Sequence, residues 1–125
     1  MSRIQGKNTK PEKMVRQYLR QQGFGYRKHV SGLPGSPDIV LTKYNSVIFV
    51  NGCFWHGHAG CKYFVIPKTR TDWWLSKINR TKERDAGNHA QLKKEGWRVF
   101  ILWECEIEHS LEQTMNELLI KIKEP

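Results

Sequence analysis

The sequence predicts an α/β fold in which a mixed central sheet is flanked by helices. Apolar runs of strand length, such as Val47–Val50, alternate with longer segments whose apolar residues recur at helical spacing. In chain order these segments read α-β-β-β-α-β-α, an order typical of a mixed sheet covered by helices. A length of 125 residues with 38% hydrophobic residues suits one core, so we expect residues 1–125 to form a single domain.

The first half of the chain predicts one helix followed by three strands. Thr9 can cap the helix, Glu12 follows three residues later as in a capping box, and Gly23 ends it. The three strands are predicted over residues 24–30, 38–42 and 46–50. Because the loops between these strands are short, we expect them to form an antiparallel meander.

The second half predicts a helix, a strand and a final helix. Thr71 can cap the first of these helices, whose buried stripe is predicted to contain Trp74, Leu75 and Ile78. The polar stretch 79–88 leaves open whether this is one long helix or two shorter ones. Residues 97–103 are almost continuously apolar, which favours a strand in the centre of the sheet. Ser110 opens the last helix.

The charge of the chain is strongly positive and unevenly distributed. The formal net charge is +9, with basic residues concentrated in 1–28 and 62–84, whereas the sequence from Glu104 onward is acidic. Basic patches with aromatic residues between them favour a polyanionic partner, and nucleic acid ahead of an anionic membrane. Neither a secretory signal nor an apolar run of membrane-spanning length is recognisable, so we expect a cytoplasmic protein.

Cysteine and histidine residues are concentrated in one short segment after the predicted strand 46–50. Three cysteines form an odd set, which argues against a disulfide framework. Cys53, His58 and Cys61 have the spacing of metal ligands, and Cys105 can complete a Cys3His zinc set if the two strands preceding these loops are neighbours. The alternatives are that the cysteines are small buried hydrophobic residues, or that His56 competes as a ligand.

Asp38 is the second candidate for a catalytic or metal-binding role. It is the sole carboxylate between Glu12 and Asp72, and it follows Pro37 at the start of an apolar strand. Such a residue can be a turn aspartate that accepts hydrogen bonds from backbone amides. It can also be a Mg²⁺ ligand, because this hard cation prefers carboxylate oxygen.

Together these motifs resemble a known family. Pro37-Asp38 followed by a strand resembles the core of the PD-(D/E)XK nucleases, although the usual second acid and lysine are absent. The chain as a whole resembles the very-short-patch (Vsr) DNA mismatch repair endonucleases, with a restriction-endonuclease-like fold and a structural zinc loop. The matching blocks cover nearly the whole chain: Leu33–Asp38, Ile48–Phe49, Gly52–His56, Thr69–Thr71, Trp74–Ile78, Glu83–Asp85, Gly96–Val99 and Trp103–Cys105.

The resemblance implies a catalytic site. Asp38 matches the catalytic aspartate that binds Mg²⁺, and Val50 matches the residue whose backbone carbonyl helps to hold this ion. His56 matches the histidine that activates water, and Glu12 matches a helix carboxylate placed near the active site. For His29, His89 and His109 we expect only packing roles.

The resemblance also implies zinc and DNA contacts. The structural zinc ligands match Cys53, His58, Cys61 and Cys105, with one extra residue between His58 and Cys61. Asn51 stands where a histidine occurs in the family, and an N-terminal arm that reaches the DNA is represented here only by Met1. Contacts with DNA, including an aromatic wedge beside the mispair, are expected from Phe54, Trp55, Met1, Asn51, Arg70 and Lys77.

The resemblance therefore implies a Mg²⁺-dependent endonuclease that acts as a monomer in very-short-patch repair. Its substrate would be double-stranded DNA with a T·G mismatch arising from 5-methylcytosine deamination, nicked on one strand 5′ to the mispaired T, and repair proteins would be its partners. Two alternatives stay open. One is an endonuclease on the same core that recognises another structure or sequence, and the other is a non-catalytic zinc module that binds DNA.

Overall fold

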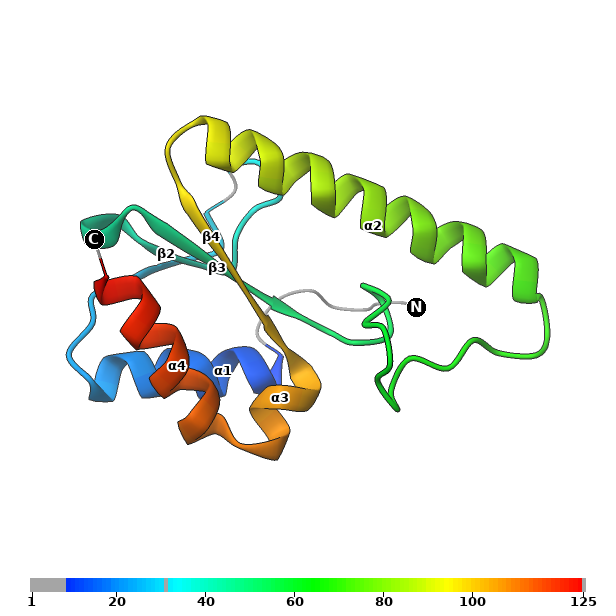
Figure 1. The fold of residues 1–125 in the computed structure, drawn as a ribbon, viewed down its shortest axis with the longest axis horizontal. Helices are drawn as coiled ribbons and strands as arrows, with labels where there is room; N and C mark the ends of the chain where they lie inside the picture. The colour runs from blue at the N-terminus through cyan, green and yellow to red at the C-terminus, as the bar shows by residue number, and fades with distance from the viewer. Residues whose placement is uncertain (1–8, 31, 125) are drawn as a thin grey trace.

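The computed structural model describes residues 9–30 and 32–124, in which a four-stranded mixed sheet carries helices on both faces (Figure 1). The strand order is β1-β2-β3-β4, with antiparallel pairs from β1 to β3 and a parallel β3–β4 pair. The strands are β1 (Arg27–Lys28), β2 (Ile39–Leu41), β3 (Ser46–Asn51) and β4 (Arg98–Trp103). The predicted meander and the mixed sheet are both confirmed.

The helices divide between the two faces of the sheet. The long helix α2 lies on one side, and α1, α3 and α4 lie on the other (Figure 1). Within the described ranges, none of these helices combines the length and apolarity needed to cross a membrane. The elements are α1 (Lys10–Gln21), α2 (Thr71–Lys94), α3 (Glu104–His109), α4 (Leu111–Lys123) and a short 3-10 helix η1 (Thr42–Tyr44).

Alternation along the strands produces two cores. In β2 and β3, Ile39, Leu41 and Ile48 face α1 and α4, where they pack with the apolar residues of those helices. On the opposite face, Val40 of β2 packs with Leu92 of α2. The same core contains Val47 and Phe49 of β3. Both faces of the central strands are therefore buried, which explains why their sequences are continuously apolar.

The position of β4 corrects the prediction that residues 97–103 form a central strand. β4 pairs only with β3 in the described sheet and so lies at its edge. Phe100 and Leu102 contact the core beneath α4, whereas Val99 packs in the core beneath α2. The apolar run thus reports that residues on both faces of the strand contact a core, although Ile101 is still 36% exposed.

Two predicted strands are shorter than expected, for local backbone reasons. Residues 24–30 yield only β1, because His29 adopts a left-handed conformation with φ of 52°. The strand predicted over 38–42 ends at Leu41, where the chain enters η1 and then turns at Asn45, with φ of 50°.

Helix caps agree with prediction at two of three places. Thr9 accepts a hydrogen bond from the Glu12 amide at 3.4 Å, and Ser110 accepts one from the Gln113 amide at 3.3 Å. Thr71, however, is the first residue of α2, and the cap position belongs to Arg70 in a left-handed conformation. Helix α2 runs without interruption through the polar stretch 79–88.

The stripe predicted for α2 is partly wrong. Ile78 is buried and Trp74 is half-buried, but Leu75 is 41% exposed. The reason is that the first half of α2 extends past the sheet and lies over the loop that follows β3 (Figure 1). Gly57 of this loop approaches Ile78 so closely that an added Cβ would lie 2.9 Å from Ile78 Cγ2. Only a narrow face of the helix is therefore covered.

Candidate active site and metal centre

Asp38 lies where the start of β2 meets the end of β3. Because these strands are antiparallel, with Ile39 opposite Ile48, Asp38 is brought beside Val50. The Val50 amide donates to Asp38 Oδ2 at 2.7 Å. This hydrogen bond fixes one carboxylate oxygen, whereas the role predicted for the Val50 carbonyl in holding Mg²⁺ stays a prediction.

Glu12 extends from the first turn of α1 toward the same place. Its side chain is 1% exposed, and its Oε2 accepts hydrogen bonds from Arg16 Nη1 and His29 Nε2. The carboxylate oxygens of Glu12 and Asp38 and a ring nitrogen of His29 all lie within 4.8 Å of one another. Glu12 thus contributes a carboxylate to the site in addition to its place in the helix cap.

The electrostatics of this group favour a bound cation. Burial raises the pKa of Asp38 from 3.8 to about 7, against the effect of the Val50 hydrogen bond. The Glu12 carboxyl group raises this pKa further by charge repulsion and hydrogen bonding, and His56 lowers it slightly. Two neighbouring acids in a buried site share a proton or bind a cation. The oxygen donors present here suit Mg²⁺ or a similar divalent ion.

His56 is held in one orientation by helix α2. Its Nδ1 donates to Asp85 Oδ2 at 2.6 Å. With the proton on Nδ1, the Nε2 atom is unprotonated and can accept a proton from a molecule bound in front of it. His56 is absent from the group that could hold zinc, so the alternative that it competes as a zinc ligand is not supported.

A cavity of about 860 Å³ brings the catalytic candidates together. Asp38 and His56 both line it, although 18 positions separate them in the chain. The other lining residues come from the start of α1, the segment between β1 and β2, the end of β3, the loop beyond it, α2 and the start of α3: Thr9, Pro11, His29, Gly35, Ser36, Phe49, Val50, Asn51, Gly52, Phe54, Trp55, Asp85 and Glu104.

The zinc ligands predicted from the sequence converge beside this cavity. The parallel register pairs Asn51 of β3 with Trp103 of β4, so Cys53 and Cys105 follow the two strands at the same edge of the sheet. The Cys105 amide donates to Cys53 Sγ at 3.4 Å, and Cys105 Sγ lies 3.4 Å from His58 Nδ1. The sequence analysis predicted that Cys105 would join the other three ligands if the two strands were neighbours, and the structure confirms that the four side chains lie together.

The donor chemistry of this group fits zinc. The ligand atoms of Cys53, His58, Cys61 and Cys105 lie within 4.8 Å of one another, close to the spacing of about 3.8 Å in a tetrahedral zinc–sulfur site. Burial raises the pKa of the Cys53 thiol to about 12, so a cation is needed to stabilise its thiolate. The His58 ring stacks on Trp103 at 4.0 Å, which fixes its orientation.

Phe54 and Trp55 form an aromatic cluster with helix α2. Their ring centroids lie 5.0 Å apart, and both rings lie within 6 Å of Trp74. Both side chains are half-buried and line the cavity. They are therefore neither ordinary core residues nor free surface residues, and a packed support behind them leaves one side facing the cavity.

The remaining predicted DNA contacts lie at separate places. Arg70 and Lys77 flank the exposed ring of Trp73 near the start of α2, at 4.8 and 5.6 Å from its centroid, and do not line the cavity. Asn51 is 5% exposed and lines the cavity at the end of β3. Met1 lies outside the described residues.

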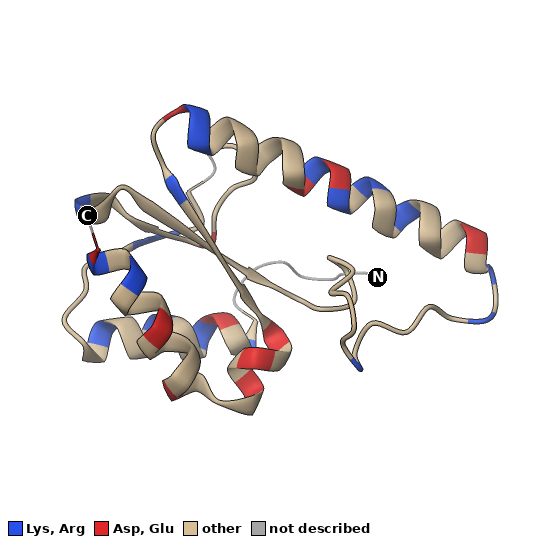
Figure 2. Cartoon of the chain, viewed as in Figure 1, with Lys and Arg blue, Asp and Glu red and all other residues tan. Residues whose placement is uncertain are grey.

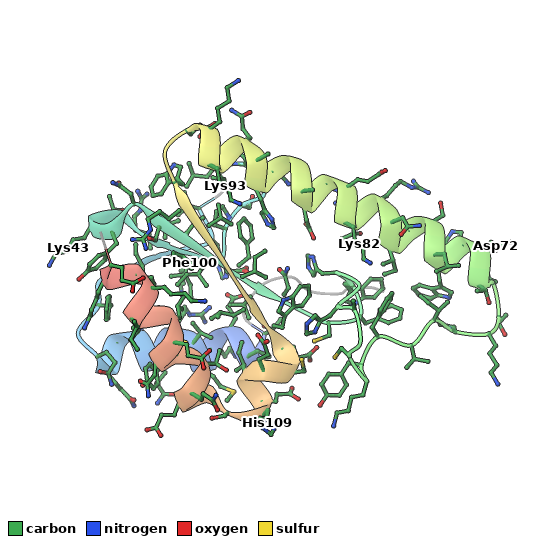
Figure 3. All side chains as sticks on the ribbon, in the orientation of Figure 1. Lys43, Asp72, Lys82, Lys93, Phe100 and His109 are labelled. Carbon is green, nitrogen blue, oxygen red and sulfur yellow. The ribbon has the colours of Figure 1, made fainter. Side chains whose placement is uncertain are left out.

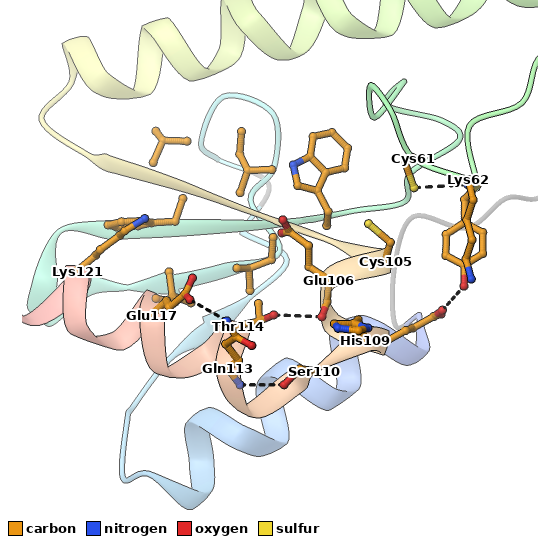
Figure 4. Close-up of a pocket in the computed structure, with 18 residues that line it drawn as sticks. Cys61, Lys62, Cys105, Glu106, His109, Ser110, Gln113, Thr114, Glu117 and Lys121 are labelled. Atoms are coloured by element: carbon orange, nitrogen blue, oxygen red, sulfur yellow. Dashed lines mark hydrogen bonds between the residues drawn. The ribbon is translucent and has the colours of Figure 1, made fainter.

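Charge is distributed unevenly among the helices. Lysine and arginine residues recur along α2, whereas acidic residues gather on α3 and its neighbourhood (Figure 2). A second cavity, of about 1,020 Å³, lies between β4, α3 and α4 (Figure 4). Its lining mixes Glu106, Glu108 and Glu117 with Lys62 and Lys121, and it contains neither Asp38 nor His56. The chemistry therefore favours the cavity with Asp38 as the active site.

Two residues near the site were not assigned roles from the sequence. Asp85 carries no local signal, because its contact with His56 depends on how α2 packs across the loop (Figure 3). His29 was expected only to pack, yet its amide donates to the Asp38 carbonyl at 3.0 Å and its ring reaches Glu12. The hairpin between β1 and β2 is the signal that could have placed His29 opposite Asp38.

Comparisons with known proteins identify a matching family and several relatives. The sequence profile of the family described as "DNA mismatch endonuclease Vsr" matches residues 1–62. The chain is 46% identical over 126 residues to the type II nicking enzyme V.NmeAIP of Neisseria meningitidis, covering 99% of this chain and 89% of that protein. It is 45% identical over 121 residues to the type II nicking enzyme V.XorIIP of Xanthomonas oryzae, covering 95% and 88%. It is 40% identical over 124 residues to the DNA mismatch endonuclease Vsr of Escherichia coli, covering 99% and 79%.

Proposed function

The chain belongs to the Vsr family of DNA mismatch endonucleases, and from this premise we propose that it nicks one strand of duplex DNA 5′ to the mispaired T of a T·G mismatch. The observation that carries the proposal is the shared cavity of Asp38 and His56. A carboxylate site for a divalent ion can relieve charge on the phosphate, and an oriented imidazole can act as the base in phosphodiester hydrolysis.

Asp38 is proposed as the principal ligand of the catalytic cation, with the Val50 carbonyl and Glu12 beside it. The carboxylate of Asp38 is preoriented by the Val50 amide at 2.7 Å. When bound there, Mg²⁺ would supply Lewis-acid chemistry that relieves negative charge on the scissile phosphate. Arg16 compensates the charge of Glu12 and keeps this buried carboxylate in place.

His56 is proposed as the general base. Because Nδ1 donates to Asp85, the Nε2 atom can accept a proton from the attacking water. The water oxygen then bonds to phosphorus, one phosphorus–oxygen ester bond breaks, and the leaving oxygen is protonated from solvent. A positioned base contributes on the order of 10²–10⁴-fold to the rate. Asp85 acts through His56 and is a positioning residue.

Phe54 and Trp55 are proposed to provide mismatch selectivity. Both rings line the cavity and are supported from behind by Trp74. Apolar wedges that enter a base step unstack it and kink the duplex. A T·G wobble pair costs less to unstack than a matched pair, so insertion itself favours the mismatch.

The charge distribution supports one docking side for the duplex. Asp85 of α2 lines the cavity, and the same helix carries Lys77, Arg80, Lys82 and Arg84, among the basic residues that recur along it (Figure 2). On the opposite side the acidic residues of α3 and the first part of α4 lie beside the basic helix α1, so that side has no comparable excess of positive charge. Phosphate contacts with lysine and arginine supply the sequence-independent part of DNA affinity. The duplex is therefore expected to lie against α2 and the loop that carries His56.

The structural cation is proposed to be zinc, held by the three cysteines and His58. It would join the ends of β3 and β4 and so fix the loop that carries the aromatic pair and His56. Its role is structural, because all four ligand positions are filled by protein side chains.

The experiment is strand nicking in Mg²⁺ on two duplexes that differ only in a T·G or a T·A pair. We expect preferential nicking of the T·G duplex, and loss of that preference in the double variant Phe54→Ala and Trp55→Ala with zinc retained. Equal nicking of both duplexes by the wild-type protein would instead support an endonuclease without mismatch selectivity. A protein that binds but never nicks, whatever the pair, would be the non-catalytic zinc module.

A further inference from the structure

His29 is a histidine that the proposed hydrolysis does not use, yet it lies in the active-site cavity. It follows β1 directly, and its backbone amide donates to the Asp38 carbonyl at 3.0 Å. Its side chain is 15% exposed, and Nε2 faces Glu12 Oε2. A histidine that served only to pack would have no reason to direct a ring nitrogen at a buried carboxylate.

Three potential ligands converge here from three separate segments. Glu12 comes from α1, His29 from the end of the β1 strand, and Asp38 from the residue before β2. Their ligand atoms all lie within 4.8 Å of one another, although 26 positions separate Glu12 from Asp38. Arg16 already forms an ion pair with Glu12 and balances its charge. An additional ion pair between His29 and Glu12 would not explain why Asp38 also lies beside them.

We propose that His29 is a nitrogen ligand of the cation at Asp38 and Glu12, and that it makes this centre selective for a transition ion such as Mn²⁺ over Mg²⁺. The inference rests on the cation site proposed above. Imidazole nitrogen binds first-row transition ions well, whereas Mg²⁺ prefers an all-oxygen shell. In the structure His29 Nε2 donates to Glu12 Oε2; a cation bound between them would replace this hydrogen bond, and with the proton on Nδ1 the Nε2 lone pair would serve as a ligand.

The left-handed backbone of His29 supports a positional role. Its φ of 52° is uncommon for a residue other than glycine, and histidine is one of the side chains that adopt it more often, with asparagine and aspartate. The conformation ends β1 and turns the side chain toward Glu12 while the amide still bonds Asp38. A histidine at this strained position is best explained by what its ring contacts.

The test measures cation affinity directly on zinc-loaded protein without DNA. Free Mn²⁺ is quantified by its electron paramagnetic resonance signal, and Mg²⁺ affinity is obtained by competition against Mn²⁺. We compare wild type, His29→Gln and the control His109→Gln, which alters an exposed histidine of α3 outside this cavity. Glutamine can still donate to Glu12 but is a poor transition-metal ligand.

We expect wild type and His109→Gln to bind Mn²⁺ alike, and His29→Gln to bind it about tenfold more weakly with a much smaller change for Mg²⁺. An unchanged Mn²⁺/Mg²⁺ affinity ratio in His29→Gln would overturn the inference. It would leave the proposed function standing, since nicking in Mg²⁺ is measured separately.

A second measurement does not depend on the variant folding. Electron spin-echo spectroscopy of Mn²⁺ bound to the wild-type protein should show coupling to a directly bound ¹⁴N nucleus. Absence of this coupling would overturn the inference. If His29→Gln unfolds at the same temperature as wild type, the ¹⁴N coupling should be absent from its spectrum. Coupling that persists in this variant would come from another residue, such as His56, and would also overturn the inference.

Discussion

Replacing Asp38 by asparagine should stabilise the magnesium-free protein at neutral pH while abolishing cleavage. Burial and the Glu12 carboxyl group raise the pKa of Asp38 to about 7, so the folded state resists ionising this residue. Asparagine has nearly the same shape as protonated aspartic acid and stays neutral at every pH. Its carbonyl oxygen can accept the hydrogen bond from the Val50 amide, and its amide group can donate to Glu12.

The sign and size of the effect follow from the shift. Between pH 3.8 and about 7 the folded state holds a proton on Asp38 that the unfolded state has lost, so stability falls as pH rises through this window. Each pKa unit corresponds to about 1.4 kcal/mol, which gives a total of about 4 kcal/mol at most. Between pH 5.5 and pH 8 the Asp38→Asn variant should gain about 2 kcal/mol over wild type.

The assay is urea unfolding of both proteins at pH 5.5 and pH 8, in magnesium-free buffer without a chelator so that zinc is retained. Asp72→Asn, which neutralises an exposed carboxylate in the first turn of α2, is the matched control and should show no such change. A stability difference between wild type and Asp38→Asn that is the same at both pH values would refute the reasoning. So would a wild-type protein that gains stability over the variant at pH 8.

Three further predictions concern the groups around the site. Cys105→Ser should weaken zinc binding by tenfold or more, because a thiolate ligand is lost, and retention of one tightly bound zinc per chain in a metal assay would contradict it. Asp85→Asn should slow single-turnover nicking about 10- to 100-fold without changing DNA affinity, because it disturbs the His56 tautomer; a wild-type rate would count against the His56–Asp85 pair. Gly57→Ala should lower the free energy of unfolding more than Gly60→Ala does, by about 1 kcal/mol or more. Both glycines have positive φ, but only an added Cβ at Gly57 meets Ile78, so equal losses in urea unfolding would show that the loop does not pack on α2 as described.

The zinc group was predictable because its logic is local. Cys53, His58 and Cys61 lie in one loop, and the fourth ligand required only that two apolar strands be neighbours. The parallel β3–β4 register satisfies this condition and places Cys105 beside Cys53. Likewise Asp38 could be singled out as a lone carboxylate before an apolar strand, where burial is expected.

The predictions that were wrong or incomplete concern features that depend on how the elements pack together. The apolar sequence of β4 was interpreted as a central strand, but an edge strand that contributes side chains to a core on each face of the sheet has the same composition. Leu75 was assigned to the buried stripe because its helical spacing is correct, yet that part of α2 lies beyond the sheet. Asp85 and His29 are drawn into the site by the crossing of α2 and by a hairpin register, and neither can be obtained from spacing alone.

The most direct test of the central claim is single-turnover nicking of a T·G duplex by wild type, Asp38→Asn and His56→Ala, with DNA affinity and zinc content measured on the same samples. The wild-type protein should nick one strand in Mg²⁺, and both variants should bind the duplex and retain zinc while losing cleavage. Cleavage at the wild-type rate by either variant would contradict the assignment of the cavity between Asp38 and His56 as the hydrolytic centre.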